Sequence, residues 1–176
     1  GRRGGRLQIL ALLGVGLLIV LAAGIRLARS GAGVTGASSA NAVGAPGPDL
    51  PIQRIKTPDE MPPGPVEHVE VAYFHRTHRC SGCINAERLT RETLDTRFAD
   101  RIARGEMNLV VEDTEAPANP ALVSRYDAWG SRLYLAVTKA GTVYTYPVDD
   151  IWFYVNEDHK FTGYLAKQIR AIYGES

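Results

Sequence analysis

The chain has 176 residues, with 20 Lys or Arg and 19 Asp or Glu, so its formal net charge is only +1. This balance argues against a nucleic-acid-binding protein, and the length suggests one domain of moderate size with additional segments. Only two cysteines are present, and both lie in one motif, which argues against a scaffold held together by several disulfides.

The N-terminal region has the pattern of a membrane anchor. A basic tail over residues 1–6 precedes an uncharged apolar run, and we predict a transmembrane helix over residues 7–29. At about 1.5 Å per residue, such a helix approaches the thickness of a bilayer core. Small residues suited to signal cleavage, at 40–42, lie too far beyond the run, so an uncleaved signal anchor is favoured over a signal peptide. Three arginines before the run and two after it predict a cytoplasmic N-terminus and a domain outside the membrane.

A linker is expected over residues 30–65. Gly, Ala and Ser dominate its first half, and prolines are frequent in the second half. This composition cannot bury enough apolar surface to offset the ordering of the chain, so it predicts a flexible and then semi-extended segment. The folded domain is therefore expected over residues 66–176.

The domain opens with a buried strand that leads into a pair of cysteines. Residues 69–74 mix β-branched and aromatic side chains, as a buried strand does, and Cys80-Ser81-Gly82-Cys83 follows. The residues after Cys83 have a helical pattern, so the pair is expected where a helix begins. Backbone N–H groups and the helix dipole favour negative charge there, which lowers the pKa of a thiol.

Basic residues close to the pair strengthen this prediction. We expect Arg76, His78 and Arg79 to tune the thiolate. In thiol–disulfide exchange, Cys80 then attacks and Cys83 resolves.

Two other interpretations of the pair remain open. The cysteines could be structural and inert, or His75, His78, Cys80 and Cys83 could bind a soft metal or zinc. Side chains alternate along a strand, so the two histidines face the same way only if the chain turns between them. Covalent haem attachment requires His after the second cysteine, and Ile84 stands there instead.

The rest of the domain alternates strands with helices. A continuous helix with Leu94, Phe98 and Ile102 facing inward ends at Gly105, and Asp149 or Asp150 and then Asp158 are expected to cap two later helices. We expect helices over residues 84–104, 120–126, 151–155 and from 158 onward, with strands over residues 107–111, 132–138 and 142–146.

Two groups of side chains outside these patterns carry expectations of their own. Trp152, Phe153 and Tyr154 are consecutive aromatics, so at least one should be exposed. His68 and His159 stand alone and are predicted to be surface residues.

A strand, Cys-Ser-Gly-Cys and a helix together resemble the thioredoxin superfamily. The run Tyr73-Phe74-His75, followed by basic residues and Cys-x-x-Cys, resembles small bacterial thioredoxin-like proteins labelled as nitrophenyl-compound nitroreductase subunits. The resemblance covers roughly residues 66–173. It implies an α/β thioredoxin-like domain with a mixed central sheet. Together with the predicted anchor and the arginine bias, this places the domain at the bacterial inner membrane, facing the periplasm.

The loop that faces the cysteines departs from the superfamily pattern. Thioredoxins carry a cis-proline there, but this chain has Trp129, Gly130 and Ser131, which we expect to line the site together with His75. Without the proline, the chain lacks the residue that best tolerates a cis bond, which argues against general reduction of protein disulfides.

The leading hypothesis is a membrane-anchored thiol–disulfide oxidoreductase that needs no diffusible cofactor and exchanges electrons with a partner dithiol. The alternative is a non-catalytic accessory subunit of a larger respiratory or photosynthetic membrane complex, with the domain as a docking module. A third hypothesis is metal binding or delivery.

Overall fold

A computed structural model of the chain describes residues 50–175, so the predicted basic tail, transmembrane helix and most of the linker lie outside the described residues. In the described part, no helix is both long enough and apolar enough to cross a bilayer.

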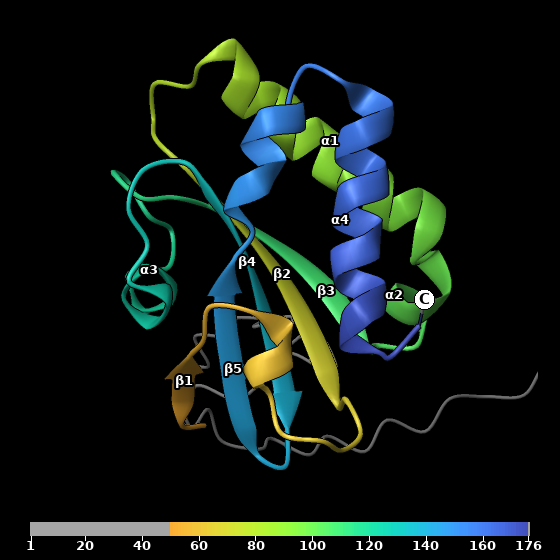
Figure 1. The fold of residues 1–176 in the computed structure, drawn as a ribbon. Helices are drawn as coiled ribbons and strands as arrows, with labels where there is room; N and C mark the ends of the chain where they lie inside the picture. Colours follow the sequence, from red (N-terminus) through yellow and green to blue (C-terminus); the bar gives the residue numbers. More distant parts are fainter. Residues whose placement is uncertain (1–49, 176) are drawn as a thin grey trace, which may run out of the picture. The chain divides into compact units, whose positions relative to one another are not determined.

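The centre of the domain is a five-stranded mixed sheet in the order β1-β5-β4-β2-β3 (Figure 1). Strand β2 runs parallel to β3 and antiparallel to β4, and β5 pairs with both β4 and β1. The strands are β1 (Ile52–Arg54), β2 (His68–His75), β3 (Met107–Asp113), β4 (Arg132–Lys139) and β5 (Thr142–Pro147). The predicted mixed α/β architecture is confirmed, and a sheet of this kind beside a Cys-x-x-Cys pair is compatible with a thioredoxin-like fold.

Two helices, α1 (Ser81–Arg97) and α4 (Asp158–Ile172), lie side by side over the sheet (Figure 1). The main core lies between these helices and the sheet, and it is built around fully buried apolar side chains such as Leu89, Phe161 and Leu165. The remaining helical segments are η1 (Pro58–Glu60), α2 (Ala99–Ala103), α3 (Pro120–Tyr126) and η2 (Asp149–Tyr154).

A smaller apolar cluster joins α3 to the sheet. Phe74, Tyr126 and Tyr134 form its centre, with ring centroids 5.2 to 5.7 Å apart. Phe74 points away from the main core because successive side chains of a strand face opposite sides of the sheet. Strand β2 is thus buried on both faces, as its sequence predicts.

The predicted continuous helix over residues 84–104 is wrong in two respects. Helix α1 already begins at Ser81, and the backbone leaves helical geometry at Phe98, with φ −134° and ψ 13°, before α2 starts. Leu94 and Phe98 are buried as predicted, and Ile102 is half-buried. The break at Phe98 lets its ring enter the core while the short α2 turns toward Gly105, which has φ 72°.

The two strands predicted over residues 132–138 and 142–146 are confirmed as β4 and β5, and they form an antiparallel hairpin. Ala140 and Gly141 have φ values of 47° and 70°, as a two-residue turn with two positive φ angles requires.

The predicted caps near the C-terminus are wrong. The helical segment that includes Asp149 and Asp150 follows Val148 without a side-chain cap, and Glu157 precedes α4, also without a cap bond. The aspartates have other partners: Asp150 accepts a hydrogen bond from Tyr164, and Asp158 pairs with Arg88 of α1.

The segment before residue 66 contains more structure than a linker pattern suggests. Strand β1 pairs in parallel with β5, with Ile52 opposite Val143, and the Ile55 N–H donates to the Thr145 carbonyl at 2.9 Å. These bonds cover the outer edge of β5, whose backbone groups would otherwise lack partners.

The prediction that His68 is a surface residue is also wrong. His68 is only 4% exposed, and its Nδ1 and Nε2 lie 3.1 Å from the Gly105 carbonyl and 2.6 Å from Asn108 Oδ1. His159 is exposed as predicted, and so is Phe153 of the aromatic run.

Candidate functional site

The two cysteines form a disulfide at the start of α1. Cys80 is the N-cap of the helix, its Sγ accepts the N–H of Cys83 at 3.0 Å, and the two Cα atoms are 5.1 Å apart. Cys80 is exposed, whereas Cys83 is half-buried. The predicted placement of the pair at a helix start is therefore confirmed, and Cys80 is the more accessible of the two.

A buried tyrosine of β2 forms a hydrogen bond to the backbone of Cys83. Tyr73, on β2, is fully buried, and its hydroxyl donates to the Cys83 carbonyl at 2.6 Å. Burial raises the pKa of Tyr73 to about 12, although the nearby Arg79 charge lowers it. The hydroxyl therefore stays protonated near neutral pH and ties the first turn of α1 to the sheet.

Removing this hydroxyl should loosen the start of α1. We expect Tyr73→Phe to lower the free energy of unfolding of the oxidised protein by about 1 kcal/mol, because one buried hydrogen bond is lost. Tyr146→Phe is the matched control, since the buried Tyr146 hydroxyl has no partner among the described residues. Urea unfolding of both variants measures the difference, and an equal effect would contradict the role assigned to Tyr73.

An ion pair between Arg79 and Glu87 lies next to the disulfide. Arg79 lies 2.6 Å from Glu87, and its guanidinium also donates to the Cys83 carbonyl at 3.4 Å. Glu87 is only 15% exposed at its side chain and binds Arg91 as well, at 2.8 Å. Glu87 therefore pairs with Arg91 and also with Arg79, the residue we expected to tune the thiolate.

The ion pairs of Glu87 make the free energy of unfolding depend on pH. Burial raises the pKa of Glu87, but hydrogen bonds from Arg91 and Arg79 outweigh it and hold that pKa below its ordinary value of 4.5. The stabilisation by the Glu87 charge is thus complete above the ordinary value and is lost as pH falls through the lower, folded-state value.

We expect Glu87→Gln to destabilise the protein at neutral pH and to cost progressively less below about pH 4, because the wild-type carboxyl is then protonated too. Urea midpoints from about pH 7 to pH 3 measure this. Glu92→Gln is the control, since the Glu92–Arg88 pair is 48% exposed on both sides and is worth less. A pH-independent cost for Glu87→Gln would contradict the assignment.

The other two residues expected to tune the thiolate are placed differently. Arg76 is 63% exposed and binds Glu115 at 2.7 Å, while Glu115 also accepts the Thr77 N–H. His78 is exposed. Charge near the cysteines in sequence is thus partly neutralised by a carboxylate from the loop after β3.

The loop before β4 reaches the disulfide through one residue. The Ser131 hydroxyl donates to Cys83 Sγ at 3.4 Å, and Gly130 next to it has φ 63°. Trp129 is 67% exposed, with the Arg132 guanidinium 4.7 Å from its ring centre. Every peptide bond of the described residues is trans. Of the three predicted lining residues in this loop, Ser131 is therefore the one that contacts a cysteine.

A shallow depression of about 480 Å³ adjoins this loop. It is lined by Arg76, Thr114, Glu115, Ala128, Trp129 and Gly130. It brings the predicted residues Arg76 and Trp129 to one surface beside the end of β2. The predicted lining residue His75 ends β2, half-buried, with its Nδ1 3.0 Å from the Arg76 carbonyl.

Val155 is a site residue that the sequence did not indicate. A Cβ placed on Gly82, between the two cysteines, would lie 3.8 Å from the Val155 side chain, so the valine packs close to the first turn of α1. The Asn85 side chain donates to the Val155 carbonyl, which fixes the segment between η2 and α4 against α1. No local pattern predicts this contact, because 70 residues separate Asn85 from Val155.

The described residues contain no group of three or more His, Cys, Asp or Glu side chains that could hold a metal. Both sulfurs are committed to the disulfide, and a metal binds the thiolate form. The four-residue array of His75, His78, Cys80 and Cys83 is therefore not assembled in this oxidised form.

In comparisons with known proteins, no protein-family model, no curated protein and no solved structure matches the chain.

Proposed function

We propose that the chain is a thioredoxin-like thiol–disulfide oxidoreductase anchored in the bacterial inner membrane. The observation that carries this proposal is the Cys80–Cys83 disulfide, whose more exposed cysteine is the N-cap of α1. A sulfur in this position is accessible to an outside thiol and lies against a backbone N–H donor.

The reaction is a reversible two-electron exchange. In the reduced protein, the Cys80 thiolate attacks a partner disulfide, so that a bond forms between Cys80 and one partner sulfur while the other leaves as a thiolate. The Cys83 thiolate then attacks Cys80 and closes the disulfide, which releases the second partner thiolate. The pair loses two electrons and the partner disulfide gains them, and the reverse steps reduce the protein again.

Two hydrogen bonds support these roles. The Cys83 N–H that reaches Cys80 Sγ stabilises the attacking thiolate, and the Ser131 hydroxyl that reaches Cys83 Sγ stabilises the resolving one. Hydrogen bonds to a charged sulfur are stronger than bonds to a neutral thiol, so both favour thiolate over thiol.

The membrane anchor and the periplasmic location of the domain are inferred from the sequence. The apolar run within residues 7–29 and the arginine bias around it predict a cytoplasmic N-terminus and a periplasmic domain. Fractionation of membranes, followed by protease digestion of intact spheroplasts, tests this, because a periplasmic domain is digested while the membrane stays closed.

Alkylation of the reduced protein at graded pH tests the chemistry. With iodoacetamide and peptide mass spectrometry, we expect Cys80 to react faster than glutathione near neutral pH and faster than Cys83. If Cys80 reacts no faster than glutathione, the nucleophile assignment is wrong.

A second candidate function is a docking subunit of a larger membrane complex, in which the disulfide is static. The observation that favours it is the exposure of three large apolar side chains, Ile84 at 54%, Trp129 at 67% and Phe153 at 79%. Purification in mild detergent distinguishes the two. Co-migration in a stable assembly that survives replacement of both cysteines by serine supports the subunit function.

A further inference from the structure

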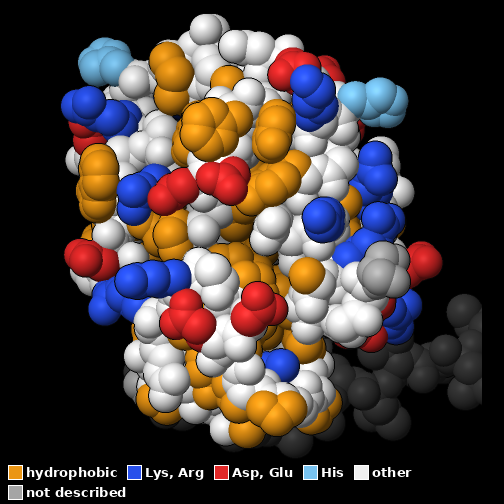
Figure 2. Space-filling model, viewed as in Figure 1, with side chains coloured by type: hydrophobic (Ala, Val, Ile, Leu, Met, Phe, Trp, Pro, Cys, Tyr) orange, Lys and Arg blue, Asp and Glu red, His pale blue; other side chains and the backbone are white. Residues whose placement is uncertain are grey.

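A second hollow lies apart from the residues that contact the disulfide, where β5 ends beside α4. Its volume is about 390 Å³, within the size range of small-ligand sites, and its walls combine residues 55–58, the end of β5, the start of η2 and α4. Figure 2 shows this face of the molecule, with acidic side chains above and below a hollow in which hydrophobic side chains are visible.

A buried hydroxyl without a partner lies in the wall of this cavity. Tyr146 lines the cavity and is only 2% exposed, yet its hydroxyl has no hydrogen-bond partner among the described residues. Burial raises the pKa of Tyr146, and Tyr164, which also lines the cavity, raises it further. Buried polar groups normally have partners, so an orphan hydroxyl at a cavity wall points to an atom that completes it.

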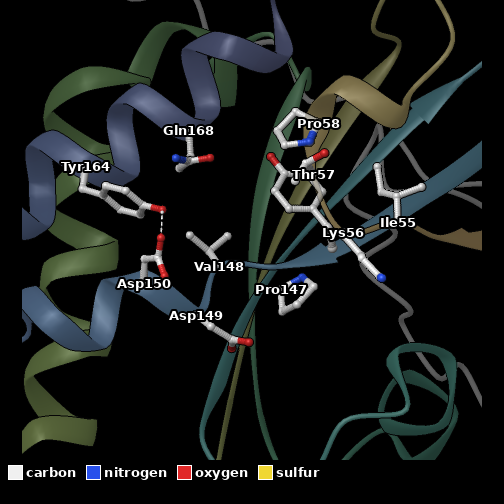
Figure 3. A pocket seen from close by; sticks show the side chains of 11 residues that line it. Ile55, Lys56, Thr57, Pro58, Pro147, Val148, Asp149, Asp150, Tyr164 and Gln168 are labelled. Carbon is white, nitrogen blue, oxygen red and sulfur yellow. Dashed lines mark hydrogen bonds between the residues drawn. The ribbon is translucent and has the colours of Figure 1, made fainter.

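Two carboxylates, Asp149 and Asp150, and one ammonium group, that of Lys56, line the cavity. Asp149 pairs with Arg132 at 3.6 Å, whereas Asp150 does not. Asp150 accepts the Tyr164 hydroxyl at 3.1 Å, and no Lys or Arg of residues 50–175 lies within ion-pair distance of Asp150. Figure 3 shows this hydrogen bond on one side of the cavity, and it shows the Lys56 side chain directed away from that side. The cavity thus offers a carboxylate that lacks a cation.

We propose that this cavity binds a small organic cation, a primary ammonium compound with a compact apolar body. The ammonium group donates to the Asp150 carboxylate and to the Tyr146 hydroxyl oxygen. The Tyr146 and Tyr164 rings favour a cation, since a cation is attracted to the face of an aromatic ring. Val148, which is buried in the wall, provides apolar contact for the body of the ligand. This proposal is independent of the redox function of the cysteines.

The test uses the full-length oxidised protein and benzylamine, which is protonated at neutral pH, with isothermal titration calorimetry and amide chemical shifts as readouts. We expect saturable binding whose shifts cluster at residues 146–150 and 164–168. Asp150→Asn keeps the acceptor for Tyr164 but removes the charge, and it should weaken binding about 10-fold or more. Tyr146→Phe should weaken binding several-fold, while Asp95→Asn, an exposed acid of α1, should change nothing.

Three outcomes overturn the proposal. They are the absence of saturable shifts at residues 146–150, equal affinity for the neutral isostere benzyl alcohol, and unchanged affinity in Asp150→Asn. Thermal unfolding of each variant shows whether that variant is folded. If Asp150→Asn does not fold, charge recognition is measured in the wild-type protein instead, where raised ionic strength should weaken the binding of benzylamine.

Discussion

Replacing Cys80 by serine should abolish thiol–disulfide exchange, and replacing Cys83 by serine should stop the reaction halfway. Cys80 is exposed and Cys83 is half-buried, so the cysteine that remains in Cys80→Ser is the less accessible one. We expect the rate of reaction with a small aromatic disulfide to fall on the order of 100-fold or more in Cys80→Ser. Cys83→Ser should react once and remain as a mixed disulfide, because no thiol resolves it.

Stopped-flow absorbance measures the first step, and intact-mass spectrometry measures the trapped species. Ser81→Ala is the matched control, since Ser81 lies between the cysteines but has no hydrogen bond to either sulfur among the described contacts. If Cys80→Ser retained the wild-type rate, or if Cys83→Ser accumulated no mixed disulfide, the assigned order of attack would be incorrect. If both variants lose disulfide turnover but still co-migrate in an intact assembly, the docking function does not depend on the exchange chemistry.

Phe161→Ala should cost about 3–5 kcal/mol of unfolding free energy, because it deletes a fully buried ring and leaves a cavity between α4 and the sheet. The loss should appear as a lower urea midpoint with little change in slope. The disulfide should remain closed in the folded fraction, since the hydrogen bonds to the two sulfurs come from the Cys83 N–H and the Ser131 hydroxyl and do not depend on the Phe161 ring.

Phe153→Ala provides the comparison within the same residue type. Phe153 is 79% exposed, so we expect its removal to change the unfolding free energy by no more than about 0.5 kcal/mol. An equal loss of unfolding free energy in Phe161→Ala and Phe153→Ala would contradict the assignment of Phe161 to the core. In the docking function, Phe153→Ala should instead weaken the assembly while leaving the fold intact.

Features that depend on short-range patterns could be predicted. The buried strand before the cysteines, the helix over residues 120–126 and the two strands over residues 132–138 and 142–146 all follow from neighbouring residues, and all are confirmed. The helical spacing of Phe161, Leu165 and Ile169 likewise identified the buried face of α4. Each of these features needs only backbone preference and the period of the apolar side chains.

Features that depend on distant partners could not be predicted. His68 was expected at the surface, but the parallel register of β2 and β3 places it beside Asn108, which supplies a hydrogen-bond partner and allows burial. Asp158 is a good capping residue by type, yet it pairs with Arg88 of α1 instead. In both cases the competing partner comes from an element far away in the sequence.

The same division applies to the candidate site. The sequence by itself determined that two cysteines stand at the start of a helix, with a buried strand before them, because residues within one short stretch decide both points. Only the tertiary structure decided which groups surround the pair: the Tyr73 hydroxyl on the Cys83 carbonyl, the Ser131 hydroxyl on Cys83 Sγ, and Val155 close to Gly82 between the cysteines. The physical reason is that these contacts arise when the sheet and the two helices pack together, and packing joins side chains whose separation along the chain gives no local signal.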